Sequence, residues 1–337
     1  MIIEYPSYYE KFRCIGGRCP DTCCAGWEVD VDEESSAYYR SIEGAFGDTL
    51  RAHIREEDGD CFFPLTKEGR CPFLRKDLLC EMYIQLGEES LCQTCTEYPR
   101  YFMDIGNYEQ IDMSLSCMEL GRIFFTECDR IEYIRSENDI PGEEISVEEQ
   151  ETLIEVLALR NRCIALLQDH GGAFLDAWQA VRALISEAQG LDPKEADAER
   201  SFLKEDFPAL VELMKHLDSL RPEWDTLVEG YEQNCRDPHF LDALPQFMQK
   251  EAAQLDRWFT KLGVYFVYRY FIDTCLDGDI EIELCLVHRS LMMILFMLYS
   301  RWTAQQQLDI SDIIDVAHLF SKEVEHDEGN VNLLKSI

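Results

Sequence analysis

Positive charge is scarce in this chain of 337 residues, which has 31 Lys and Arg against 66 Asp and Glu. The formal net charge is therefore −35 at pH 7. Proteins that bind nucleic acid or an anionic membrane surface use basic residues to neutralise phosphate, so the composition argues against both partners. A lysine-bearing protein surface is a more suitable partner, although the same charge can serve only to keep the protein soluble.

The chain also lacks a long uninterrupted apolar run. Its two longest apolar stretches, 262–276 and 284–299, are shorter than the roughly 20 residues of a membrane helix and contain Arg269 and Arg289. The first residues, MIIEYPSYYE, have no basic segment and no long apolar segment, so no signal peptide is predicted. We therefore expect a cytoplasmic protein without a membrane segment, in a compartment that keeps thiols reduced.

Several catalytic motifs are missing as well. The sequence has no H-E-x-x-H, no Walker loop and no G-x-S-x-G, so the common hydrolase and NTPase interpretations have no support. It shows no alternation of strands and helices, and neither of its two Gly-Gly pairs follows a strand as in a dinucleotide-binding turn. Any methyl transfer would therefore use a scaffold other than the doubly wound sheet.

Cysteine is abundant by contrast. Ten of the 15 cysteines lie between positions 14 and 117. Thiolates are soft, charged ligands of zinc and iron, and close spacings such as Cys19-x3-Cys23-Cys24 and Cys92-x2-Cys95 let several converge. In a reducing compartment such clustering indicates metal rather than disulfides. The alternative is that thiols pack as small apolar side chains, which suits the five later cysteines.

The positions of glycine and proline and the hydrophobic periodicity divide the chain into two parts. Glycine and proline interrupt residues 1–130, where the patterns predict a short strand at 27–32, helices at 33–43 and 81–86, and a hairpin of strands 101–105 and 108–113. Helical periodicity begins at Ser146, which opens a capping box completed by Glu149. The expected helices are 146–167, 173–188, 194–217, 222–235, 244–275, 280–302 and 311–326.

These patterns predict a mainly α protein. An irregular Cys-rich metal-binding module with a short β-hairpin, residues 1–130, packs on a C-terminal α-helical domain, residues 146–337. Composition predicts the boundary between the two parts at 131–145. A module with so little regular structure needs an additional cross-link to be stable, and bound metal is the available one.

The runs CIGGRCPDTCCAGW, GRCPFL, LGEESLCQTCTEYPR and SLSC resemble the flagellin lysine-N-methylase family of bacteria. They also resemble, more distantly, a family of small zinc- or iron-chelating domains. The motifs cover roughly residues 12–117, and the helical remainder is similar to the methylases in a less specific way. The resemblance implies N-methylation of surface lysines on flagellin with S-adenosylmethionine as donor. It also implies an iron–sulfur cluster, of the 4Fe-4S type, with zinc as the alternative.

By position, the resemblance implies eight metal ligands: Cys14, Cys19, Cys23, Cys24, Cys71, Cys80, Cys95 and Cys117. Cys92 stands where serine is common in the family and is set aside together with Cys61. Eight thiols exceed the four that one cluster needs. Either some of them are structural, or a second site exists.

Three further residues are candidates for binding the methyl donor. Tyr265 and Arg269 share a helix face, where the guanidinium could fork a carboxylate and the ring could hold a cation. The alternative is an aromatic helix in the core with Arg269 paired to an acid. Arg100 follows Cys95 closely and could neutralise thiolates or bind a carboxylate, or it could be a plain surface arginine.

A lysine methylase must deprotonate its substrate amine, because an ammonium has no lone pair for attack. With 66 acidic residues and 15 tyrosines, the sequence singles out no catalytic base. The alternative function is a non-catalytic zinc- or iron-binding or redox module.

Overall fold

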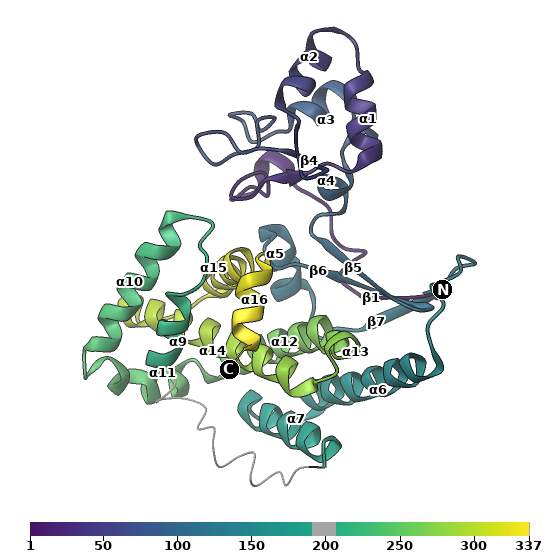
Figure 1. Cartoon of the computed structure of the whole chain (residues 1–337). Helices are drawn as coiled ribbons and strands as arrows, with labels where there is room; N and C mark the ends of the chain where they lie inside the picture. Colours follow the sequence, from purple (N-terminus) through teal and green to yellow (C-terminus); the bar gives the residue numbers. More distant parts are fainter. Residues whose placement is uncertain (191–206, 337) are drawn as a thin grey trace.

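The computed structural model describes residues 1–190 and 207–336. The mainly α class is confirmed, and the chain forms a small module and a larger helical body (Figure 1). The module carries short elements: β2 (Val29–Asp30), α1 (Glu33–Ser41), α2 (Gly44–His53), β3 (Arg55–Glu57), β4 (Asp60–Phe63), α3 (Glu81–Leu86), α4 (Gln93–Glu97) and the 3-10 turns η1 (Gly16–Arg18) and η2 (Glu88–Ser90). The expected helices at 33–43 and 81–86 are α1 and α3.

A four-stranded sheet connects the module to the body. Its strands β1 (Ile2–Pro6), β5 (Arg100–Ile105), β6 (Tyr108–Met113) and β7 (Tyr133–Glu137) lie in the order β5-β6-β1-β7. Ile105 faces Tyr108 in the antiparallel β5–β6 pair, which confirms the predicted hairpin with its two-residue turn. β1 runs parallel to β6 and antiparallel to β7. The stretch 131–145, expected as the boundary, therefore contains a strand of this sheet.

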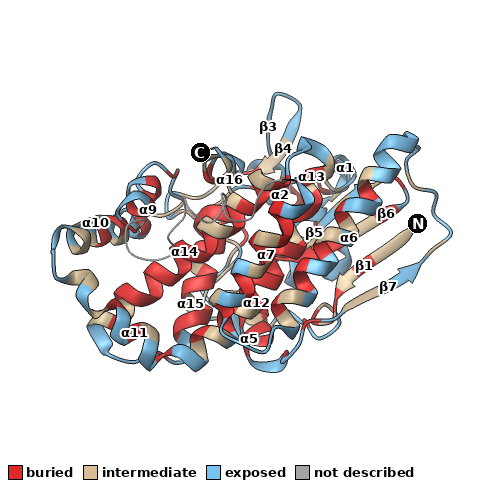
Figure 2. Ribbon diagram, turned by 90° about the horizontal axis from the view of Figure 1, so that it is seen from below, coloured by how far each residue is buried: buried red, intermediate tan, exposed pale blue. Residues whose placement is uncertain are grey.

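The body is built around two long helices, α12 and α14. The elements of this part are α5 (Met118–Glu127), α6 (Val147–Asp169), α7 (Phe174–Ala188), α9 (Phe207–Met214), α10 (Pro222–Arg236), η3 (Phe240–Ala243), α11 (Leu244–Lys250), α12 (Ala252–Tyr270), η4 (Phe271–Asp273), α13 (Thr274–Asp277), α14 (Ile280–Gln305), α15 (Ile310–Phe320), η5 (Ser321–Glu325) and α16 (Glu328–Lys335). Buried residues concentrate on α7, α12, α14 and α15 (Figure 2). Their apolar side chains form one large core.

Local signals explain where several helices begin and end. The Ser146 side chain accepts from the Glu149 amide and Glu149 bonds back to Ser146, so the predicted capping box starts α6. The expected helix 244–275 is divided into α11, α12, η4 and α13. The expected helix 311–326 ends in a π-helical turn, η5. Most of the first part of the expected helix 194–217 lies outside the described residues.

The helix α14 is long and apolar enough to cross a membrane by length and composition alone. In this structure 78% of its most apolar window is buried inside the protein. Such burial is typical of a central core helix, which is how α14 contacts α12, α15 and α16.

Candidate thiol centres and the adjoining polar cluster

The front cysteines fall into two neighbourhoods. The first, the boundary set, lies where the module adjoins the body: Cys14, Cys19, Cys23 and Cys117. The second, the module set, lies within the module: Cys24, Cys71, Cys80, Cys92 and Cys95. Cys23 and Cys24, neighbours in the chain, are hydrogen-bonded through their side chains and connect the two sets.

The boundary set is shaped by a 3-10 turn and a helix start. In the turn η1, the Cys19 amide donates to Gly16 O at 2.9 Å, and the Gly16 amide donates to the Cys14 Sγ at 3.4 Å. Gly16 has a φ of +54°, which glycine adopts without strain. Cys117 precedes the first turn of α5. Burial, together with smaller contributions from the neighbouring thiols of Cys19 and Cys14, raises the pKa of Cys117 to about 12.

The module set is held by backbone pairing and a small core. The Cys71 amide donates to Cys24 O at 2.8 Å, and Cys80 is bridged to Leu74. Cys71 and Cys92 are buried in the module's own apolar cluster. Burial raises the pKa of Cys71 to about 12, with smaller contributions from the thiols of Cys24 and Cys80.

Two thiol pairs are in direct contact. The hydrogen bond from Cys95 lowers the pKa of Cys92, and the hydrogen bond from Cys23, aided by Thr22, lowers the pKa of Cys24 to about 7. In each pair, one thiol therefore ionises more readily. The resulting thiolate is the form that binds metal.

The predicted ligands lie near one another in two sets, but their side chains are not yet in the arrangement that coordinates a metal ion. Among residues 1–190 and 207–336, no three Cys, His, Asp or Glu side chains are already arranged to hold a metal ion. The donor chemistry nevertheless fits a thiophilic metal, because each set offers at least four thiols. Cys92, which was set aside from sequence, is buried beside Cys95. Cys61 is instead hydrogen-bonded to Ser36 and Arg40.

A polar cluster adjoins the boundary set. His326, at the end of η5, is hydrogen-bonded to the Ser116 hydroxyl at 2.6 Å and to the Tyr101 hydroxyl at 2.9 Å. Its ring stacks on Trp27 with ring centroids 4.8 Å apart. Tyr98 also bonds to Ser116, at 3.0 Å. Burial, followed by the positive charge of nearby basic residues, lowers the pKa of His326 to about 3, so the imidazole is neutral at physiological pH.

A buried ammonium fastens the cysteine loop to the body. Lys322 is 1% exposed and donates to Asp21 Oδ2 at 2.9 Å and to Thr22 O at 3.1 Å. It also lies over the Trp27 ring, 4.9 Å from the centroid. His318 approaches the same Asp21 oxygen at 2.9 Å. Burial alone would raise the pKa of Asp21, but the bonds from His318 and Lys322 hold it well below its usual range.

Two of the residues predicted to bind the methyl donor instead contact acidic side chains of the protein. Arg269 donates a hydrogen bond to Asp112 at 2.6 Å and is ion-paired with Glu325 at 3.0 Å, and its guanidinium covers the Tyr101 ring. The Tyr265 hydroxyl donates to Glu325 at 3.2 Å. Burial raises the pKa of Asp112 to about 6 despite the neighbouring Arg269. This is the arrangement that the core alternative describes.

Arg100, the third predicted residue, begins β5. Its guanidinium lies over the rings of Tyr9 and Phe12, at 5.1 and 5.4 Å from their centroids. It donates to Glu97 O at 3.3 Å. Cation–π stacking fixes the plane of the group while leaving edge donors available.

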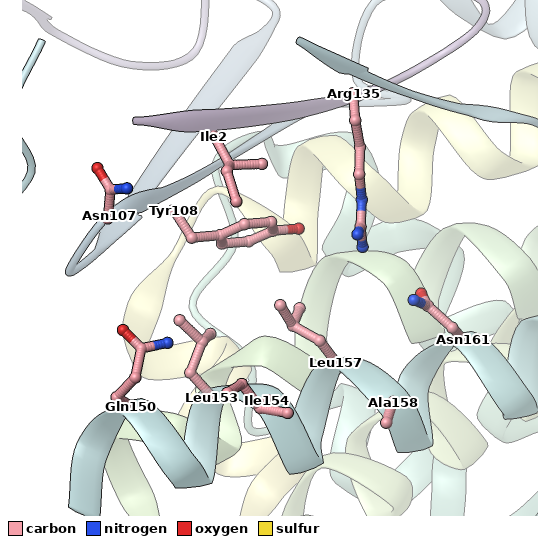
Figure 3. Close-up of a pocket in the computed structure, with 10 residues that line it drawn as sticks. All are labelled: Ile2, Asn107, Tyr108, Arg135, Gln150, Leu153, Ile154, Leu157, Ala158 and Asn161. Carbon is pink, nitrogen blue, oxygen red and sulfur yellow. The ribbon is translucent and has the colours of Figure 1, made fainter. Parts of the chain in front are cut away.

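A cavity in the described part of the chain lies away from these residues. It has a volume of about 410 Å³ and lies between the starts of β1 and β6 and the helix α6 (Figure 3). Ile2 and Tyr108 come from the strands, and Leu153 and Leu157 from the helix. None of the residues predicted to bind metal or the methyl donor lines it, and no motif in the sequence predicts it.

Sequence reasoning missed the polar residues beside the thiols. Lys322 bonds to Asp21, 301 residues away, and His326 bonds to Ser116, 210 residues away, and no local pattern indicates such contacts. A usable signal was present in Ser116, which belongs to the run SLSC and directly precedes a predicted ligand.

Comparison with known proteins gives three consistent matches. The lysine-N-methylases of Salmonella choleraesuis (strain SC-B67) and Salmonella typhimurium (strain LT2) are 29% and 28% identical over 127 residues, 36% of this chain. The aligned region spans 31% of the length of each of these two relatives. The flagellar biosynthetic protein FliU of Salmonella muenchen is 29% identical over 130 residues, covering 75% of that protein. No solved structure matches the chain.

The family model of the FliB lysine N-methylase C-terminal domain matches residues 147–337, the helical body. The family resemblance noted in the front cysteine motifs is thereby confirmed from the other end of the chain. Since the matched region is more than half of the sequence, this protein belongs to the FliB lysine N-methylase family.

Proposed function

We propose that this protein is a lysine N-methyltransferase that acts on surface lysines of flagellin with S-adenosylmethionine as methyl donor. The observation that carries the proposal is the match of residues 147–337 to the C-terminal domain of the FliB lysine N-methylases. Relatives named lysine-N-methylase and flagellar biosynthetic protein support the reaction and the flagellar substrate.

The proposed metal centre is an iron–sulfur cluster, with zinc as the alternative. Its ligands would come from the front cysteines of the boundary set or of the module set, because thiolates are the soft ligands that both metals take. When bound, an iron–sulfur cluster supplies one-electron transfer. Clustering of thiols alone also supports the second candidate, a non-catalytic metal-binding or redox module.

Charge favours a lysine-bearing substrate. A net charge of −35 attracts a basic surface and would speed its encounter with the protein. The substrate ammonium must then lose a proton, and desolvation against a buried site would lower its pKa. We place this chemistry in the cytoplasm, where reduced thiols remain available for metal.

For the carboxylate of the donor, Arg100 is the most available of the three predicted residues. Among the described residues, its guanidinium donates to one backbone carbonyl, Glu97 O, so most of its five N–H groups remain for a ligand. Arg269 is already ion-paired with two carboxylates, and the Tyr265 hydroxyl donates to one of them. A ligand at Arg269 would have to displace Asp112 or Glu325.

The decisive experiment is an anaerobic assay of metal-loaded protein with labelled S-adenosylmethionine and flagellin. We expect label on flagellin as N-methyl-lysine, found by mass spectrometry of tryptic peptides. Flagellin with acetylated lysines is the matched control and should remain unlabelled. Absence of transfer by protein whose metal content has been verified would exclude the methyltransferase.

A binding measurement separates the two candidate functions. A ligand at 100 times its Kd stabilises the folded state by about 2.7 kcal/mol. S-adenosylmethionine should therefore raise the melting temperature of a methyltransferase, whereas a redox module without a donor site should show no shift.

A further inference from the structure

We infer that the front cysteines hold two separate metal centres, one at the boundary set and one at the module set. Cys14, Cys19, Cys23 and Cys117 are the ligands of the first. Cys24, Cys71 and Cys80, with Cys95 and its partner Cys92, supply the second. The inference rests on the metal part of the proposed function and assigns its ligands; it does not depend on methyl transfer.

The two sets belong to different packing units. Cys71 and Cys92 are buried in the module's own core, and Cys24 and Cys80 pack against that core. Cys117 instead packs against the large core of the body, at the start of α5. Ligands of one centre must converge within a few ångströms, and side chains anchored in separate cores are poorly placed to do so.

Backbone pairing draws the module set together. The Cys71 amide donates to Cys24 O at 2.8 Å, the bridge between Ala25 and Arg70 continues that pairing, and Cys80 is bridged to Leu74 in the next turn. The segments around positions 24, 71 and 80 are thus fixed to one another. Cys92 and Cys95 complete the set from the start of α4.

The boundary set is built separately from the loop around η1 and the start of α5. Cys14 and Cys19 flank the 3-10 turn, and the Gly16 amide points at the Cys14 sulfur. Most electrostatic interactions of the thiols stay within one set: that of Cys117 is with Cys19 and Cys14, and that of Cys71 is with Cys24, Cys80 and Cys92. The contact between Cys23 and Cys24 is where the two sets meet.

Burial suggests different roles for the two centres. The module core comprises only ten buried residues, two of which are cysteines, so the module centre serves as its staple. Cys14 and Cys23 are exposed, and the neighbouring residues Thr22 and Trp27 contact Lys322 and His326 of the body. The boundary centre is therefore the one that faces the polar cluster.

The test counts metal, without substrate. Iron, zinc and acid-labile sulfide per chain, with absorption near 400 nm, are measured on anaerobically purified protein and on Cys14→Ser, Cys80→Ser and the double variant. We expect each single variant to lose the metal of one centre and to keep that of the other. The double variant should lose the metal of both centres. Cys61→Ser, in the same module but outside both sets, is the matched control and should keep all metal.

Two results would overturn the inference. If Cys14→Ser or Cys80→Ser alone removes all the metal, the thiols share one centre. If neither changes the metal content, the sets are not ligands. Should Cys80→Ser fail to fold, Cys14→Ser and Cys19→Ser decide the matter, because both must leave the same remainder of metal in a folded protein, as judged by circular dichroism.

The inference and the proposed function can fail separately. Two centres in a protein that transfers no methyl group would refute only the methyltransferase. Methyl transfer by a protein in which one substitution removes all metal would refute only the two centres.

Discussion

Arg269 shows how a side chain suited to ligand binding can be occupied by its own protein. The guanidinium is 9% exposed and joins Asp112 on β6 to Glu325 in the π-helical turn η5. Tyr265 and Tyr270 donate to the same glutamate. A buried ion pair of this kind holds three elements in a defined arrangement, but its net contribution to stability depends on both charges being matched.

Replacing Arg269 with Met should be strongly destabilising. The substitution leaves Asp112 and Glu325 buried without a counter-charge, and breaking a buried pair in this way costs about 3–5 kcal/mol. The free energy of unfolding from urea titration is the measurement.

Arg122→Met provides the matched control, because that arginine pairs with Glu119 and Glu127 at the surface and is 47% exposed. It should change stability by less than about 1 kcal/mol. Equal effects of the two substitutions would show that Arg269 does not balance buried charge, and would favour its alternative role toward a ligand.

Elements with strong local signals were predictable from sequence. The capping box at Ser146 gives the start of α6, and the residues of α3 match the expected helix 81–86. Gly106-Asn107 gives the hairpin of β5 and β6, because a two-residue turn fixes its register. In these cases the residues that specify the structure are neighbours in the chain.

Contacts between distant segments were not predictable. β1 pairs with β6 and β7, more than 100 residues away, and its sequence IIEYP carries no signal for either partner. The same limit applies to the candidate site. The cysteines were recognised from their spacing and family motifs, but their division into two sets depends on which core each residue joins.

The loop that carries Cys23 and Cys24 depends on Trp27 for its attachment to the body. Its ring stacks on His326 and also contacts the ammonium of Lys322. Trp27→Ala should lower the free energy of unfolding by about 1–3 kcal/mol, since a partly buried aromatic contact is lost.

Limited proteolysis shows which part of the chain the Trp27→Ala substitution destabilises. We expect faster cleavage of Trp27→Ala within residues 14–28, with the helical body cut at the wild-type rate. Trp27→Phe retains an aromatic face and should restore much of the protection. Uniformly faster cleavage along the chain would instead mean that Trp27 contributes to global stability rather than to this attachment.

The whole molecule combines a small thiol-rich module with a helical body that contains most of the apolar core. Two features act across both parts: the sheet that β1, β5, β6 and β7 form, and the excess negative charge. A net charge of −35 destabilises the compact state through self-repulsion while it favours encounter with a basic partner. Salt should therefore act in opposite directions on folding and on association.

Raising the NaCl concentration from about 10 to about 300 mM should increase the melting temperature, because the screening length falls from about 30 Å to below 10 Å. KCl should act equally if screening is the cause, and calorimetry over the same series measures the shift. The surface pairs, such as Arg122 with Glu119, weaken under the same conditions, but each contributes little. A melting temperature that falls with salt would therefore mean that local ion pairs outweigh the repulsion among 66 acidic residues.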